Sequence, residues 1–277
     1  MQPIPTLDHV VVNVRDQIDD GQETYRRLGF TLTPRGYHSL GSINHLAIFG
    51  TDYLELIAAR PDDSQLPEIL RAPIGLNGLV FGTENASVTY AELLDGGVSV
   101  EPPLKLSRPV EVSEGQREAE FRTVQLSPGT TSIGRIYFCQ HLTRDLIWRD
   151  EWRHHANGTI GVARAVIVAS APAAIGALFA RMFGADAVRP ILGGFSLAVG
   201  LSRFDIIVPA ELARQFGDAA PAPEGRKEFM AALTLRTRSL DHVVSALAAG
   251  SVNAVREPDR ILVPAAAAFA IALEFRA

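Results

Sequence analysis

The sequence predicts an α+β fold in which four β-α-β-β-β units pair into two cupped, mostly antiparallel sheets, with the helices outside. Two observations lead to this prediction. A short apolar strand, an amphipathic helix, a glycine that ends the helix and then extended sequence follow one another four times. The units begin at residues 7, 76, 160 and 229, so the intervals between them are 69, 84 and 69 residues. Internal repetition of this kind determines the architecture more firmly than any single motif.

Length and composition agree with this fold and exclude several classes of protein. A chain of 277 residues predicts two domains of ordinary size, which we place at residues 1–145 and 156–277. The net charge of -5 argues against a nucleic-acid-binding surface, because such a surface needs clustered lysine and arginine. The single cysteine, Cys139, excludes an intrachain disulfide and predicts an inert buried thiol.

The distribution of apolar residues predicts where the protein is found. The first residues lack the basic segment and apolar run of a secretory signal. No uncharged apolar stretch reaches the length of about 18 residues that a membrane-spanning helix requires. We therefore expect a cytoplasmic protein that contacts no membrane.

The first half contains two of the units. Residues 7–14 are apolar and β-branched, which predicts a strand, and the helix behind them ends at Gly29. Extended segments follow at residues 31–34, 44–49 and 53–57. The second unit has its first strand at 76–83, a helix at about 87–94 and later strands at 118–126 and 134–141. The polar stretch from Pro109 to Gln116 predicts a loop, which we expect to act as a mobile flap.

A link and two further units complete the chain. Residues 142–158 join the halves, and Trp148 and Trp152 are spaced to dock one face of this link against a domain. His154 and His155 lie in a charged stretch, so we expect both to be solvent-exposed. The last strand of the fourth unit, at residues 267–275, is rich in alanine, which predicts tight packing with little room for a pocket.

Two polar residues stand in strands that are otherwise apolar. Because side chains alternate between the faces of a strand, His9, Val11 and Asn13 share one face of the first strand. Glu55 shares a face with Tyr53 in the same way. A buried carboxylate is costly unless it is paired, protonated or bound to a metal. We therefore expect His9 and Glu55 to face one cavity on the concave side of the first sheet.

A histidine and a carboxylate in one cavity suit a divalent metal. The third ligand is His141, at the end of the second unit's last strand, with His45 and His38 as the other candidates. Alternatively, His9 and Glu55 hydrogen-bond each other and no metal binds. The residues alone leave both interpretations open.

Three segments carry a resemblance to a known family: Leu7-Asp-His-Val-Val-Val, His38-Ser-Leu-Gly-Ser-Ile-Asn44 and Tyr53-Leu-Glu-Leu-Ile57. They resemble the glyoxalase-like domain branch of the vicinal oxygen chelate superfamily, which includes glyoxalases, extradiol dioxygenases and bleomycin-resistance proteins. The resemblance implies a divalent metal (Zn, Fe, Mn or Ni) held by ligands on the first and last strands of units, where His9 and Glu55 stand. It also implies that His38, Asn44 and Tyr53 contact the substrate. No organic cofactor is implied.

The sequence departs from the family's pattern in its later units. Gly78 stands where a ligand histidine would be expected, and the first strand of the third unit has no histidine. Glu274 matches Glu55 in position within the last unit but has no partner histidine. We therefore expect the second domain to be degenerate, or to serve only as an interface in a homodimer.

These residues predict one of two functions. In the first, the protein is a metal-dependent lyase, isomerase or dioxygenase that acts on a small oxygen-chelating substrate, with Glu55 as the catalytic residue and His9, Glu55 and His141 as metal ligands. In the alternative, it is a metal-free small-molecule binding or resistance protein. The partner in both is a small molecule, not a nucleic acid.

Overall fold

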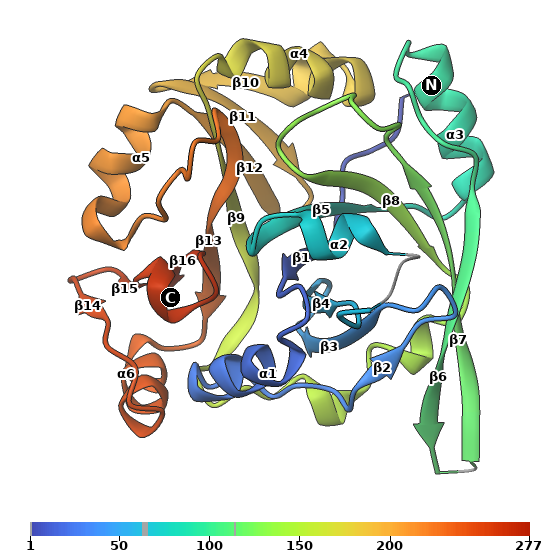
Figure 1. Ribbon diagram of the computed structural model, residues 1–277. Helices are drawn as coiled ribbons and strands as arrows, with labels where there is room; N and C mark the ends of the chain where they lie inside the picture. The colour runs from blue at the N-terminus through green and yellow to red at the C-terminus, as the bar shows by residue number, and fades with distance from the viewer. Residues whose placement is uncertain (1, 63–65, 114) are drawn as a thin grey trace.

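The computed structural model describes residues 2–62, 66–113 and 115–277, and it contains two eight-stranded mixed sheets (Figure 1). The strands of the first sheet are β1 (Leu7–Asn13), β2 (Gly36–Tyr37), β3 (Ile43–Ile48), β4 (Tyr53–Ala58), β5 (Gly75–Gly82), β6 (Leu104–Val112), β7 (Gly115–Gln125) and β8 (Arg135–His141). The helices of this half are α1 (Ile18–Arg27), α2 (Pro67–Arg71) and α3 (Ala86–Asp95).

The second half repeats this plan. Its strands are β9 (Thr159–Ala169), β10 (Val188–Ile191), β11 (Gly194–Val199), β12 (Ser202–Ile207), β13 (Glu228–Thr237), β14 (Val255–Arg256), β15 (Ile261–Val263) and β16 (Ala272–Arg276). Its helices are α4 (Pro172–Phe183), α5 (Pro209–Phe216) and α6 (Leu240–Ala249). The sequence analysis did not predict α5.

The strand order confirms the predicted fold. The first sheet runs β2-β3-β4-β1-β5-β8-β7-β6 and the second β10-β11-β12-β9-β13-β16-β15-β14. In the first sheet β1 pairs parallel with β4 and antiparallel with β5. In the second, β9 pairs in the same way with β12 and β13. Each half therefore consists of two units joined along their first strands.

The two halves share one apolar core on the helix-bearing faces of the sheets. Phe81 of β5 lies against Phe179 and Phe183 of α4 and against Phe204 of β12. The Asp52 carboxylate also accepts a hydrogen bond of 2.9 Å from the backbone N–H of Val162. The first sheet ends at His141 and the second begins at Thr159, while the predicted domains 1–145 and 156–277 stay a prediction.

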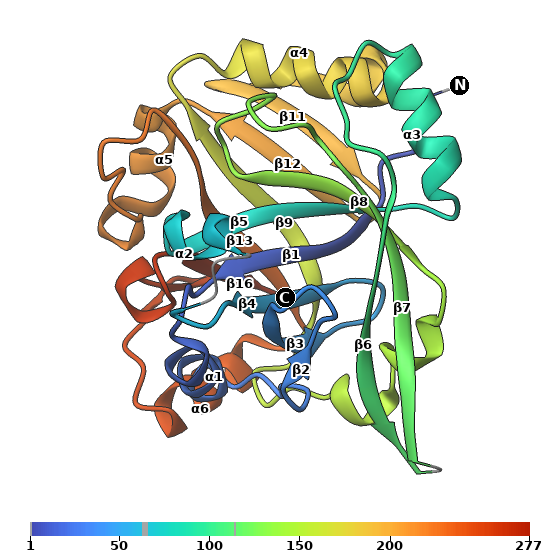
Figure 2. The ribbon, with the colours of Figure 1, turned by 45° about the vertical axis from the view of Figure 1, so that its right-hand side comes forward.

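Two of the glycines that end helices allow these halves to approach closely. Helices α1 and α6 lie side by side, and a Cβ atom at Gly250 would lie only 1.9 Å from the carbonyl oxygen of Arg27 (Figures 1 and 2). At the other end of the molecule, a Cβ atom at Gly96 would lie 2.9 Å from the carbonyl oxygen of Arg181, in α4. Glycine is therefore needed at these positions for packing as well as for ending the helix.

The predicted loop between Pro109 and Gln116 is wrong. This stretch belongs to β6 and β7, which form an antiparallel hairpin from the pair Leu104 and Thr123 to the pair Val112 and Gly115. Figures 1 and 2 show the hairpin extending beyond the rest of the first sheet. Pro109 is tolerated there because β6 is the edge strand of the sheet, and the backbone N–H groups on its outer edge have no neighbouring strand to bond.

The link between the sheets packs as predicted, with one exception. Trp152 is buried, and the Trp148 ring lies 5.5 Å from that of Tyr53 and 4.9 Å from that of His141. Contrary to the prediction, the His155 side chain is partly buried. Its Nδ1 accepts a hydrogen bond from the Thr31 N–H, its Nε2 donates to a backbone carbonyl, and burial lowers its pKa to about 4.

Two of the expected strands differ from the observed ones in their bounds. Residues 31–34 form no strand, and β2 follows them instead. The last strand begins at Ala272, because residues 265–267 form a 3-10 turn. Within the described residues, no helix is long and apolar enough to cross a membrane.

Candidate functional site

A cavity of about 130 Å³ lies on the concave side of the first sheet. Strands β1, β3, β4, β6, β7 and β8 and the start of α2 supply its walls. The polar side chains that line it are His9, His38, Ser42, Asn44, Tyr53, Glu55, Glu68, Arg108, Thr123, Gln125, Arg135 and Tyr137. This cavity, called the first cup below, contains five of the six residues that the sequence analysis singled out.

His9 and Glu55 face this cavity together, which confirms the prediction from strand alternation. His9 Nε2 lies 3.6 Å from a Glu55 carboxylate oxygen and 3.0 Å from the Tyr137 hydroxyl. The His9 ring stacks on Tyr53, with ring centroids 4.3 Å apart. Glu55 is only 5% exposed. The imidazole and the carboxylate are therefore held close enough to share a proton or a ligand atom.

Asp8 is a site residue that the sequence analysis missed. Leu7 pairs with Phe81 and His9 with Val80, so β1 has one more residue than β5 at this point, a β-bulge. The bulge brings the Asp8 carboxylate onto the same side as His9. A single oxygen of Asp8 lies 2.6 Å from His9 Nδ1 and 3.0 Å from His141 Nε2.

The charge of Asp8 determines which nitrogen His9 presents. Burial alone would raise the pKa of Asp8, but the charge and hydrogen bond of His141 and the hydrogen bond of His9 outweigh it and hold that pKa well below its usual range. An ionised carboxylate only accepts hydrogen bonds, so His9 Nδ1 donates to it. The nitrogen that faces Tyr137 and Glu55 is therefore Nε2, which carries the lone pair whenever the ring is neutral.

The residues predicted to contact substrate lie beside this pair. Asn44 Nδ2 donates to Glu55 at 2.6 Å and lies 3.4 Å from His38 Nε2. Burial lowers the pKa of His38 to about 4, with the Glu55 charge opposing that shift. Burial also raises the pKa of the Tyr53 hydroxyl. His38, Asn44 and Tyr53 thus line one cavity, and their contact with substrate stays a prediction.

Arg108, on β6, is the second site residue that the sequence analysis missed. Its side chain lines the cavity, and the residue is 3% exposed. Burial lowers the pKa of its guanidinium. Its Nη2 is buried and has no hydrogen-bond partner among the described residues. Strand alternation would have identified this position had Pro109 not made the stretch look like a loop.

His141, the predicted third metal ligand, does not lie beside both His9 and Glu55. His141 lies at Asp8, on the Nδ1 side of the His9 ring, whereas Glu55 lies on the Nε2 side. His45, another candidate, donates its Nδ1–H to the Thr33 carbonyl at 2.8 Å and does not line the cavity. A Cβ atom at Gly78 would lie 2.8 Å from Cβ of Val11, so no side chain fits there. The His9–Glu55 pair thus offers two donors.

A different group of residues could hold a metal ion. Among the described residues, donor atoms of Asp8, Cys139 and His141 lie within 4.8 Å of one another. An aspartate oxygen, a cysteine sulfur and a histidine nitrogen are all ligands of zinc. Burial raises the pKa of the Cys139 thiol, so a bound metal would have to displace its proton. These three residues also line a separate cavity of about 620 Å³ near the N-terminal segment.

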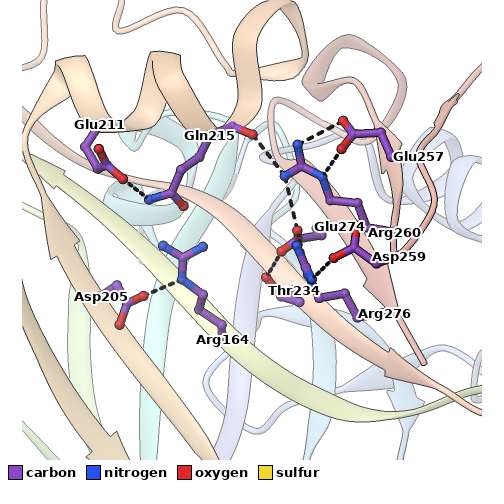
Figure 3. Close-up of polar contacts among 10 residues, drawn as sticks. All are labelled: Arg164, Asp205, Glu211, Gln215, Thr234, Glu257, Asp259, Arg260, Glu274 and Arg276. Atoms are coloured by element: carbon purple, nitrogen blue, oxygen red, sulfur yellow. Dashed lines mark hydrogen bonds and ion pairs between the residues drawn. The ribbon is translucent and has the colours of Figure 1, made fainter. Parts of the chain in front are cut away.

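The second half carries different residues at the corresponding positions. Val11 pairs with Glu55 and Val166 with Asp205, so Asp205 occupies the place of Glu55 and Arg164 that of His9. Arg164 Nε lies 2.5 Å from Asp205 (Figure 3). Glu274 accepts hydrogen bonds from Thr234, Arg260 and Arg276.

Several solved structures share this fold. A hypothetical protein from Staphylococcus aureus has a TM-score of 0.69 and 12% identity, over 99% of each chain. A variant of 4-hydroxymandelate synthase from Streptomyces coelicolor has a TM-score of 0.60 and 13% identity, over 99% of this chain and 92% of the other. A fusion of a xylose isomerase-like TIM barrel with 4-hydroxyphenylpyruvate dioxygenase has a TM-score of 0.58 and 12% identity, over 99% of this chain and 49% of the other. These identities establish similarity of fold alone.

Sequence comparison identifies the family. No curated protein sequence matches the chain. Residues 7–183, more than half of the chain and all of the first cup, match the glyoxalase-like domain family. The protein therefore belongs to the glyoxalase-like domain family of the vicinal oxygen chelate superfamily.

Proposed function

We propose that the first cup is the active site of an enzyme that moves a proton on a small oxygen-bearing molecule, as an isomerase or a lyase. One observation carries this proposal: the Glu55 carboxylate is buried at the cavity wall, 3.6 Å from His9 Nε2. A buried carboxylate beside an imidazole is a general acid–base pair, whose protonation states are set by the environment. The fold supports a small-molecule ligand.

Each residue around the pair has a role that follows from its contacts. Glu55 accepts the proton from the substrate, and the Asn44 amide holds the carboxylate in place. His9 Nε2 accepts a proton or hydrogen bond from a substrate hydroxyl, while Asp8 fixes the orientation of its ring. The Tyr137 hydroxyl, 3.0 Å from Nε2, donates to that nitrogen or to an oxygen of the substrate. Tyr53 supports the His9 ring by stacking.

A metal-dependent lyase or dioxygenase is the second candidate, and the cluster of Asp8, Cys139 and His141 favours it. The predicted set of His9, Glu55 and His141 would become a site only if His141 left Asp8. A divalent ion supplies Lewis-acid stabilisation of an oxyanion when it is bound. The remaining alternative is a metal-free binding protein, in which a small molecule occupies the cavity and no bond is broken.

Replacing Glu55 by glutamine tests the acid–base role. We expect Glu55→Gln to reduce the incorporation of solvent deuterium into small 2-oxo and 2-hydroxy carboxylates by about 10²–10⁴-fold, because glutamine cannot accept a proton. Proton NMR measures this exchange. Glu118→Gln, on the exposed part of β7, is the matched control and should exchange at the wild-type rate. Equal rates for wild type and Glu55→Gln would refute the proposed role.

The same variant separates the metal and metal-free candidates. In a metalloprotein, a chelator lowers the melting temperature of the wild type, and metal analysis finds about one ion per chain. If the ion lies at His9 and Glu55, Glu55→Gln binds less metal than the wild type. If the ion lies in the cluster of Asp8, Cys139 and His141, Cys139→Ser binds less metal. A chelator-insensitive wild type, with an unchanged or higher melting temperature for Glu55→Gln, fits the metal-free protein.

A further inference from the structure

Arg108 is a buried cation in the wall of the first cup that lacks the partners such a group needs. A buried charge is stable only when it is paired and its hydrogen bonds are satisfied. The residue is 3% exposed, and its Nη2 has no hydrogen-bond partner among the described residues. The Glu55 and Tyr53 side chains are near enough to influence its charge, but neither accepts a hydrogen bond from it.

Two further polar atoms, on residues that line the same cavity, are also buried without hydrogen-bond partners among the described residues. They are the side-chain oxygen of Asn44 and the hydroxyl of Thr123, and both residues line the cavity with Arg108. Buried polar groups without partners are rare in folded proteins, and three around one cavity indicate that a ligand completes them. Arg108 only donates, Asn44 Oδ1 only accepts and Thr123 does either.

We propose that Arg108 binds a carboxylate of the ligand, and that Asn44 and Thr123 bind a hydroxyl or amine on the same molecule. The planar guanidinium suits a carboxylate, because it can donate two parallel hydrogen bonds. This assignment rests on the proposed function only in taking the first cup as the active site. It makes Arg108 the residue that selects anionic substrates, opposite the Glu55 that reacts with them.

The dimensions of the cavity restrict the ligand further. Its volume is about 130 Å³. An apolar cavity of about 150 Å³ holds a benzene molecule. A volume of this size suits a small carboxylate such as lactate.

The second half shows what the chain does with a buried arginine that has only a structural role. Arg164 is 7% exposed and pairs with Asp205, which also accepts a hydrogen bond from Ser196 at 2.6 Å. Arg108 is buried more completely, and its Nη2 has no such partner within residues 2–62, 66–113 and 115–277. An unpaired buried charge destabilises a fold, so its presence here agrees with a role in binding.

Thermal unfolding of the full chain with matched ligands tests the proposal. The probes are lactate, its neutral analogue lactamide, acetate, benzoate and chloride, at equal ionic strength. We expect lactate to raise the melting temperature of the wild type and lactamide to have no effect. Arg108→Met should abolish the lactate effect, whereas Arg117→Met, on the exposed face of β7, should retain it. Without ligand, Arg108→Met should melt about 2–4 °C higher, because an unpaired buried charge is gone.

Several results would overturn the assignment. Equal stabilisation by lactamide or by chloride would show that no carboxylate is recognised, as would a panel in which no carboxylate shifts the melting temperature. A lactate effect that survives in Arg108→Met would place the anion elsewhere. Glu55→Gln separates this outcome from failure of the proposed function. It should still bind lactate, since Arg108 is intact, even if deuterium exchange proves independent of Glu55.

Discussion

The two sheets have the same strand order, yet one encloses a cavity and the other a set of ion pairs. In the first cup, His9, Glu55 and Tyr137 surround open space. At the matching positions of the second half, Arg164 binds Asp205, and Glu274 is held by two arginines and a threonine (Figure 3). The same fold thus supports both outcomes, and the side chains at a few cup-facing positions determine which one occurs.

The helix after the fourth strand of each half differs in the same sense. In the second half α5 packs Leu212 and Phe216 against alanines of β13 and β16. In the first half the shorter α2 contributes Ile69 to the cavity wall and leaves the space open. The alanine-rich last strand predicted tight packing, and Ala272 of this strand is fully buried in the cluster. The second half is therefore packed where the first half keeps a cavity.

The largest effect is expected from breaking the buried ion pair of the second half. Arg164→Met should lower the free energy of unfolding towards the lower end of about 3–5 kcal/mol, because Asp205 loses its buried partner and keeps only Ser196 and the more exposed Arg203. Urea unfolding followed by circular dichroism measures this change. The double variant Arg164→Met/Asp205→Leu should recover most of the loss. If Arg164→Met were as stable as the wild type, the buried ion pair would not stabilise the second half, and the halves would not differ in this way.

A second variant should convert the filled half into one with a cavity. Phe216→Ala should cost about 3 kcal/mol, because it removes a buried ring and leaves a void beside the alanines. Benzene should raise the melting temperature of this variant but not that of the wild type, since a dry apolar cavity binds it. If benzene stabilised both equally, the second half would already contain an accessible space.

The smallest expected effect concerns acid, and it compares one histidine of the first half with one carboxylate of the second. His38 titrates near pH 4 in the fold and near 6.5 when unfolded, so the unfolded chain binds more protons in that window. A shift of this size corresponds to at most about 3 kcal/mol, and because His38 is only half-buried we expect stability to fall by about 1–2 kcal/mol between pH 6.5 and 4. Hydrogen bonds and charges from Thr234, Arg276 and Arg260 lower the pKa of Glu274 against the effect of burial, so its contribution is lost only as the pH falls below about 4.5.

Variants in each half assign these two windows. Unfolding measured with chelator present should show a smaller loss above pH 4.5 for His38→Gln. Glu274→Gln should be less stable than wild type at neutral pH and should change less below pH 4.5. Identical pH profiles for wild type and His38→Gln would show that this histidine is not held neutral by the fold.

The sequence predicted what depends on regular periodicity and missed what depends on local exceptions to it. Alternation along β1 and β4 placed His9 and Glu55 in one cavity, and the repeated glycines marked the helix ends. Asp8 could not be predicted in this way, because a bulge reverses the alternation at one residue. The strand with Arg108 was hidden by Pro109, which only an edge strand accepts.

Other errors arose from tertiary contacts that no local pattern contains. His155 follows an exposed histidine in a charged segment, yet it fits between Phe30 and Phe49 and bonds backbone groups of the first sheet. His141 was predicted as a partner of Glu55, but its nitrogen bonds Asp8 from the opposite side of His9. Both outcomes depend on which chain segments meet in space, and one sequence does not specify this.

The core that the halves share bears on how this gene can change after its internal duplication. One copy of a duplicated unit is usually free to decay or be deleted. Here, loss of residues 159–277 would expose Phe81, which rests on phenylalanines of the second half, and would remove the backbone donor to Asp52. A change that loosens the second half therefore also affects the first cup, since the second half keeps water away from the back of the sheet that lines the cavity.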